Sequence, residues 1–105
     1  MEIDVHTFAE ARAAGAAVID VREAGEYHVG HVPGARLIPL GELPQRVEEL
    51  GRDERLYLIC ASGKRSLMAA RWLLQRDYDA VSVAGGTLAW IEAGMPIDDG
   101  SAPAC

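Results

Sequence analysis

The residues best suited to chemistry lie in one short segment, Cys60-Ala61-Ser62-Gly63-Lys64-Arg65. The thiolate is the reactive form of cysteine, and a helix N-terminus or nearby cations lower the thiol pKa from about 8.5 to roughly 3.5–7.5. Gly63 permits a tight turn, and its small neighbours leave room for several N–H groups to point at one sulfur or anion. The segment therefore predicts a nucleophilic cysteine in an anion-binding loop.

The elements on either side of Cys60 can place it at the edge of a sheet. The apolar run Leu56–Cys60 predicts a buried strand, and an apolar stripe predicts a helix from near Lys64 or Arg65 to about Arg76. Ligands of open parallel sheets bind beyond the carboxyl ends of the strands, where helix N-termini present unpaired N–H groups. We therefore expect Cys60 at such an end, ionised and accessible to solvent.

Short β-branched runs alternate with amphipathic stretches through the chain, which indicates βαβ units and a parallel sheet. Helices are expected from a capping box at Thr7–Glu10 to Gly15, from Leu43 to Gly51, and around Leu88 and Ile91 up to Gly94. The expected strands are residues 3–5, 17–21, 36–39, 56–60 and 80–83. We expect one domain over residues 1–97, followed by a flexible C-terminal tail over residues 98–105.

Composition limits the classes of partner. The chain has 105 residues, a net charge of −6 and no apolar stretch near twenty residues, so it suits one ordinary core and is expected to avoid nucleic acid and membranes. We expect a soluble, cytoplasmic protein. Its two cysteines, Cys60 and Cys105, form no Cys-x-x-Cys pair, so Cys60 is expected to be a free thiol.

Less specific interpretations apply to several of these residues. Most free cysteines are small hydrophobes of the core, but the loop after Cys60 favours a functional one. Lys64 and Arg65 oppose the helix dipole at a helix start, which favours anion binding over a solvated surface. His28 and His31 lack an evident third metal ligand, so a structural turn is favoured over a metal or a general base.

Together, these motifs resemble the single-domain rhodanese family. Cys60-Ala61-Ser62-Gly63-Lys64-Arg65-Ser66 is similar to its active-site loop, residues 19–22 to its Asp-Val-Arg segment, and residues 30–35 to its Gly-His-Ile-Pro-Gly-Ala turn. Gly85-Gly86 with Trp90 resembles its C-terminal signature. The resemblance implies an α/β fold with three layers, in which helices cover both faces of a five-stranded parallel sheet of order 3-2-4-5-1.

The resemblance also implies a sulfurtransferase. Cys60 would carry sulfur as a persulfide, residues Ala61, Ser62, Gly63, Lys64 and Arg65 would bind the substrate, and Asp20, Arg22 and Ser66 would support the site. The implied partners are a small anionic donor such as thiosulfate and a thiol or cyanide acceptor, with no metal or other cofactor. Ala61 departs from the arginine that many relatives carry, which removes a positive side chain from the loop rim.

Two other functions share these residues. A cysteine phosphatase or arsenate reductase uses Cys-x5-Arg, but the position six after Cys60 is Ser66 and the arginine comes one residue earlier. The shorter loop favours sulfur over a tetrahedral oxyanion. A persulfide relay or binding module that exchanges sulfur with a partner protein remains open, because it needs the same thiolate and loop.

Overall fold

Five parallel strands form the sheet of the computed structural model, which describes residues 1–99. The strand order β1-β5-β4-β2-β3 is the predicted order read from the opposite edge. The strands are short: four of the five begin at the residue that the sequence predicts, β1 begins one residue earlier, and all five end at or before the predicted last residue. They are β1 (Glu2–Ile3), β2 (Ala17–Asp20), β3 (Arg36–Leu37), β4 (Leu56–Ile59) and β5 (Ala80–Val83).

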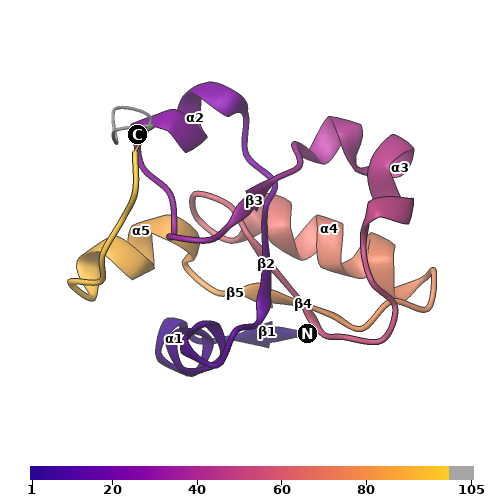
Figure 1. Cartoon of the computed structure of the whole chain (residues 1–105), viewed down its shortest axis with the longest axis horizontal. Helices are drawn as coiled ribbons and strands as arrows, with labels where there is room; N and C mark the ends of the chain where they lie inside the picture. Colours follow the sequence, from indigo (N-terminus) through magenta and orange to yellow (C-terminus); the bar gives the residue numbers. More distant parts are fainter. Residues whose placement is uncertain (100–105) are drawn as a thin grey trace.

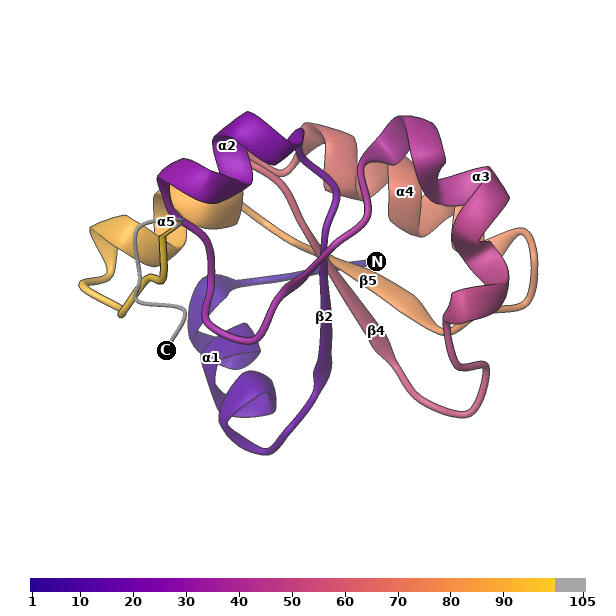
Figure 2. The same ribbon diagram turned by 45° about the horizontal axis from the view of Figure 1, so that its top comes forward.

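Helices cover both faces of this sheet, which confirms the expected α/β fold. Figures 1 and 2 show α1 and α5 on one side of the strands and α3 and α4 on the other, with α2 near the loops that follow the strands. No helix within residues 1–99 has the length and apolar character needed to cross a membrane. The helices are α1 (Val5–Ala13), α2 (Ala24–Val29), α3 (Leu43–Arg46), α4 (Lys64–Leu74) and α5 (Gly86–Glu92).

Alternation along the strands divides the core between the two faces. Leu56 and Leu58 of β4 pack in a cluster with residues of α3 and α4. Ile59 belongs to the opposite cluster, where Phe8 of α1 and Trp90 of α5 meet edge to face with ring centroids 5.4 Å apart. Each fully buried side chain of this size contributes about 1.5–3 kcal/mol to folding, so the central strand β4 is held from both sides.

Two expectations about the helices need correction. Helix α1 is capped by Asp4, whose carboxylate accepts a hydrogen bond from the Thr7 N–H at 2.7 Å. The helix that was expected to continue to Gly51 is α-helical only to Arg46, and a 3₁₀ turn over Val47–Glu49 follows it. The physical reason is the same for both helices, because the backbone groups at a helix end need hydrogen-bond partners. The Asp4 side chain provides one at the start of α1, and the tight 3₁₀ turn provides one after α3.

The C-terminal part of the chain also differs from expectation. Leu88 and Ile91 of α5 are 56% and 46% exposed, so they are not the core stripe that the spacing predicted, and Trp90 provides the buried contact. Asp98 exchanges backbone hydrogen bonds of 2.8 and 2.9 Å with His31, so the predicted flexible tail begins with a paired residue. The rest of that tail, residues 100–105, lies outside the described residues.

Candidate functional site

Strand β4 delivers Cys60 to the carboxyl edge of the sheet, as the sequence predicts. The loop that follows ends at Gly63, whose φ of 101° lies in the left-handed region. A Cβ at this position would stand 3.2 Å from the Gly85 nitrogen and 3.4 Å from the Val83 carbonyl oxygen. Glycine is therefore needed both for the turn and for its packing against the segment after β5.

The sulfur of Cys60 lies in a ring of hydrogen-bonding groups. The Gly63 N–H donates to Sγ at 3.1 Å, and the Ser66 Oγ lies 3.4 Å from Sγ. Burial alone raises the pKa of the Cys60 thiol, but the hydroxyl of Ser66 and the backbone N–H groups of Ser66, Gly63 and Ser62 lower it by more. The pKa of Cys60 is therefore below its ordinary value, because fixed dipoles favour the thiolate.

A buried pair of serines extends this network beneath the sulfur. Ser66 Oγ lies 2.7 Å from Ser82 Oγ and donates to the Gly63 carbonyl oxygen at 3.2 Å. Ser66 has only one hydroxyl proton, so it can donate to the thiolate of Cys60 only by turning away from Gly63. A hydrogen bond from Ser82 would then satisfy the acceptor lone pairs of Ser66.

Helix α5 closes the site from the other side. The N–H groups of Thr87 and Leu88 donate to the carbonyl oxygens of Cys60 and Ala61 at 2.8 and 3.1 Å. A Cβ on Gly86, which has a φ of +59°, would stand only 2.4 Å from the Cys60 oxygen. The first turn of α5 is therefore held against the loop at a separation that only glycine permits.

The expectation that Cys60 is accessible is wrong for this conformation, in which the residue is only 1% exposed. The cause is the close approach of α5 and the inward fold of the loop at Gly63, neither of which local spacing reveals. Ala61 is half-buried, whereas Ser62 and Lys64 are exposed. The loop residues thus surround the sulfur and also cover it.

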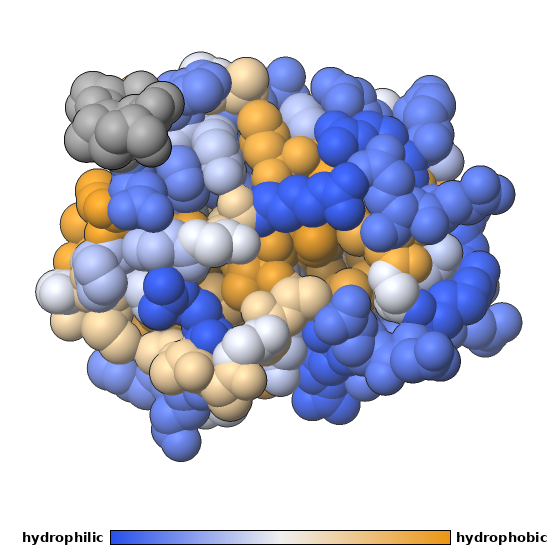
Figure 3. Space-filling view, in the orientation of Figure 1, coloured by the Kyte–Doolittle hydropathy of each residue, from blue (hydrophilic) through white to orange (hydrophobic). Residues whose placement is uncertain are grey.

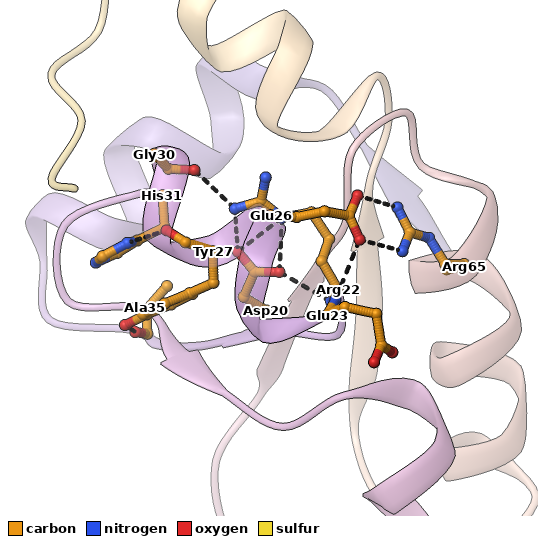
Figure 4. A network of polar contacts seen from close by, with 9 residues as sticks. All are labelled: Asp20, Arg22, Glu23, Glu26, Tyr27, Gly30, His31, Ala35 and Arg65. Carbon is orange, nitrogen blue, oxygen red and sulfur yellow. Dashed lines mark hydrogen bonds and ion pairs between the residues drawn. The ribbon is translucent and has the colours of Figure 1, made fainter. Parts of the chain in front are cut away.

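Arg65 is not available as an anion-binding cation in the way the sequence suggested. Its guanidinium donates to both carboxylate oxygens of Glu26 in α2, at 2.7 and 2.8 Å (Figure 4). The Arg65 hydrogen bonds lower the pKa of Glu26 to about 2, and Glu26 in turn raises the pKa of Arg65. The bidentate pair ties α2 to the start of α4 across 39 residues of sequence.

Asp20, the last residue of β2, and Arg22, which follows the strand, form an internal polar network. Asp20 is 0% exposed and receives two arginine N–H groups, at 2.7 Å from Nη2 and 3.0 Å from Nε. The same Arg22 Nη2 donates to the Gly30 carbonyl oxygen at 2.8 Å. Figure 4 shows this network beside the Glu26–Arg65 pair, so α2 is fixed to the sheet end through both arginines.

The histidines have structural contacts. His31 stacks on Tyr27 with ring centroids 3.6 Å apart, and its Nδ1 lies 2.8 Å from the Tyr27 carbonyl oxygen. The Tyr27 hydroxyl donates to the Ala35 carbonyl oxygen at 2.6 Å. Over residues 1–99, no three His, Cys, Asp or Glu side chains come together as ligands for a metal ion.

Sequence reasoning assigned no site role to Glu26 or Ser82. Ser82 is a hydroxyl in an otherwise apolar strand, which is a signal that a buried polar partner is needed. Glu26 forms a capping box with Glu23, and this local role conceals its distant bond to Arg65. Gly85-Gly86 was expected to form a tight turn that lets the last helix approach the active-site loop, and Gly86 does lie against the Cys60 carbonyl oxygen.

Comparisons with known proteins agree with this geometry. Residues 4–93 match the family model described as the rhodanese-like domain. A protein of Allochromatium vinosum named sulfurtransferase is 35% identical over 81 residues, and the match covers 76% of each protein.

Two further similarities concern a longer protein and a solved structure. The Bacillus subtilis protein named "Putative sulfur carrier protein YrkF" is 43% identical over 74 residues, which are 70% of this chain but only 40% of that protein. A rhodanese-related protein of Thermoplasma volcanium superposes with a TM-score of 0.87 and 36% identity, covering 92% of this chain and 96% of that one.

Proposed function

Because this chain belongs to the rhodanese-like domain family, we propose that it is a sulfurtransferase that carries a sulfane sulfur as a persulfide on Cys60. The observation that carries this proposal is the ring of hydrogen bonds around Sγ. The Gly63 N–H at 3.1 Å and the Ser66 hydroxyl at 3.4 Å favour the thiolate over the thiol. A thiolate is the form that attacks sulfur.

In the first half-reaction the Cys60 thiolate attacks the outer sulfur of a donor, for which we propose thiosulfate. The bond between the two sulfurs of thiosulfate breaks, and its electron pair leaves with sulfite. The product is Cys60–S–S⁻. The Gly63 N–H stabilises the thiolate, and we expect the backbone N–H groups of the loop to stabilise the negative charge of the persulfide as well.

In the second half-reaction a nucleophile takes the outer sulfur. With cyanide, a carbon–sulfur bond forms, the persulfide S–S bond breaks, and its electron pair returns to Cys60 as the thiolate. The two steps are a ping-pong sequence with a covalent enzyme intermediate. All charge and atoms are accounted for by donor and acceptor, so the reaction consumes no reductant.

An enclosed sulfur cannot meet a donor, so turnover requires the cover over Cys60 to open. The contacts that open are between the loop and α5, where Thr87 and Leu88 donate backbone hydrogen bonds to the loop. Strand β4 and the Ser66–Ser82 pair lie on the inner side of the sulfur and can stay in place. Loop opening is thus a step of the proposed mechanism.

A persulfide relay is the second candidate, and the charges around the loop favour it. Arg65 is paired with Glu26 and Arg22 with Asp20, so in the described part of the chain Lys64 is the only cation of the loop without an ion pair. A binding site for a free dianionic donor such as thiosulfate would gain from more positive charge. Less positive charge is needed at the site when sulfur arrives as the persulfide of a partner protein, such as a cysteine desulfurase.

Intact-mass measurement tests the proposal. Incubation with thiosulfate is expected to add one sulfur atom to the protein, and later addition of cyanide to remove it as thiocyanate. Cys60→Ser abolishes both results, whereas Cys105→Ser leaves them unchanged. Transfer that survives Cys60→Ser would refute the assignment. Loading by a desulfurase without loading by thiosulfate would favour the relay over the free-standing enzyme.

A further inference from the structure

A pocket of about 220 Å³ lies beside the reactive loop, between α2, α5 and the segment before Asp98. Its lining is mostly apolar and includes Ala61, Val29, Leu88, Ile91 and Ile97. Pockets for drug-sized ligands measure about 300–1,000 Å³. The size of this pocket suits a chain of a few carbon atoms, and excludes a whole coenzyme.

The pocket shares a wall with the site of sulfur transfer. Ala61 is the residue next to Cys60, and its carbonyl oxygen accepts a hydrogen bond from Leu88 at 3.1 Å. Thr87, which also lines the pocket, donates its N–H to the Cys60 carbonyl oxygen at 2.8 Å. In the proposed mechanism these contacts open to uncover Cys60, which would join the pocket to the sulfur.

The pocket offers no uncompensated charge. Its two charged lining residues are Arg22, which is paired with Asp20, and Glu26, which is paired with Arg65. Thr87 provides a polar group, because its hydroxyl is buried and has no hydrogen-bond partner in the described part of the structure. The electrostatics therefore match an uncharged ligand with an apolar body and at most one or two polar atoms.

Exposed apolar side chains gather at the mouth of this pocket. Val29, Leu88, Ile91 and Ile97 are 81%, 56%, 46% and 42% exposed, and they are four of the seven large hydrophobic residues exposed within residues 1–99. Figure 3 shows apolar surface on the side of the molecule where α5 lies. Such clustering beside a reactive group indicates a binding surface, because scattered apolar residues would need no explanation.

We propose that this pocket holds the carbon chain of the sulfur acceptor, and that the preferred acceptor is an uncharged aliphatic thiol of a few carbons. The inference rests on the proposed persulfide at Cys60. The acceptor thiolate attacks the outer sulfur of Cys60–S–S⁻, a new S–S bond forms, and the bond to Sγ breaks. Its electron pair stays on Cys60 as the thiolate, and the product leaves as the persulfide anion R–S–S⁻.

Acceptor selectivity tests the pocket. In protein loaded from thiosulfate, kcat/KM is measured for 3-mercapto-1-propanol, for its anionic counterpart 3-mercaptopropionate, and for cyanide, with thiol values corrected to thiolate concentration. The wild type is expected to prefer the uncharged thiol by about tenfold, because the carboxylate of 3-mercaptopropionate would lose its hydration in a pocket that has no unpaired cation. Equal use of both thiols would overturn the proposal.

Substitutions at the mouth locate the effect. Leu88→Asn and Ile91→Asn are each expected to lower the ratio of 3-mercapto-1-propanol to cyanide kcat/KM about fivefold. Met68→Asn is the matched control, because Met68 is 59% exposed on α4 and does not line the pocket; its ratio is expected to equal that of the wild type. Equal ratios in all four proteins would refute the pocket alone, whereas absence of thiocyanate in the wild type would refute the proposed function as well.

Discussion

Replacing Ser66 with alanine is the most direct perturbation of the proposed thiolate. Ser66 is fully buried, and its hydroxyl is the largest single contribution that lowers the pKa of Cys60. The Gly63 N–H at 3.1 Å remains in the variant. The Ser66→Ala protein therefore keeps part of the network and loses the side chain that can donate to the sulfur from below.

The expected size follows from the geometry. A hydrogen bond to a charged group contributes about 1.5–3 kcal/mol, and the 3.4 Å separation from sulfur places this one at the lower end. One pKa unit corresponds to about 1.4 kcal/mol, so Ser66→Ala should raise the pKa of the Cys60 thiol by about one unit. At a pH below that pKa, the rate of thiolate reactions falls about tenfold.

The assay is the pH dependence of alkylation by iodoacetamide, checked by the ultraviolet absorbance of the thiolate. Ser82→Ala is the control, because it removes the second hydroxyl but leaves Ser66 in contact with the sulfur, so its pKa rise should be smaller. Circular dichroism verifies folding, since Ser66→Ala leaves the Ser82 oxygen without its 2.7 Å partner. A Ser66→Ala midpoint within 0.3 units (about 0.4 kcal/mol) of the wild type would refute the reasoning.

Three other predictions concern the surroundings of the site. Gly86→Ala should lower the melting temperature by about 5 °C or more, because its Cβ would meet a backbone oxygen at 2.4 Å; an unchanged transition in calorimetry contradicts this. Asp20→Asn should lower the free energy of unfolding in urea by about 3–5 kcal/mol, because it leaves the Arg22 charge buried without its partner. A loss below about 1 kcal/mol (less than a factor of about ten in the folding equilibrium) argues against this prediction. The pKa of Glu26 is lowered to about 2, so its pair with Arg65 stabilises the fold fully above pH 4.5 and progressively less toward pH 2. Glu26→Gln should flatten that part of the acid-unfolding curve, and an unchanged slope would exclude the pair as its source.

The sequence predicted the central elements well because their signals are local. The β-branched runs of β2, β4 and β5 and the apolar stripe of α4 are readable without knowledge of the fold. The strand order came instead from the resemblance, since periodicity carries no information about which strands are neighbours. The prediction of Cys60 at the end of β4 used both the local sequence pattern and the family resemblance.

What escaped prediction depends on residues far apart in the chain. Arg65 looked like a free cation because its partner Glu26 precedes it by 39 residues. The burial of Cys60 depends on α5, whose first turn contacts the loop although another helix and strand separate the two in the sequence. The exposure of Leu88 and Ile91 was missed because their spacing also suits a core-facing helix. In each case, tertiary packing decided between two local possibilities.

The backbone hydrogen bonds from Thr87 and Leu88 to the loop have a consequence for synthesis of the chain. The segment around Cys60 is synthesised well before α5, but its carbonyl oxygens accept hydrogen bonds from backbone N–H groups of that helix. A nascent chain on the ribosome therefore has an incomplete pocket and an uncovered sulfur until residues 86–92 emerge. The contacts that cover the thiol therefore form late, when α5 packs against the rest of the domain.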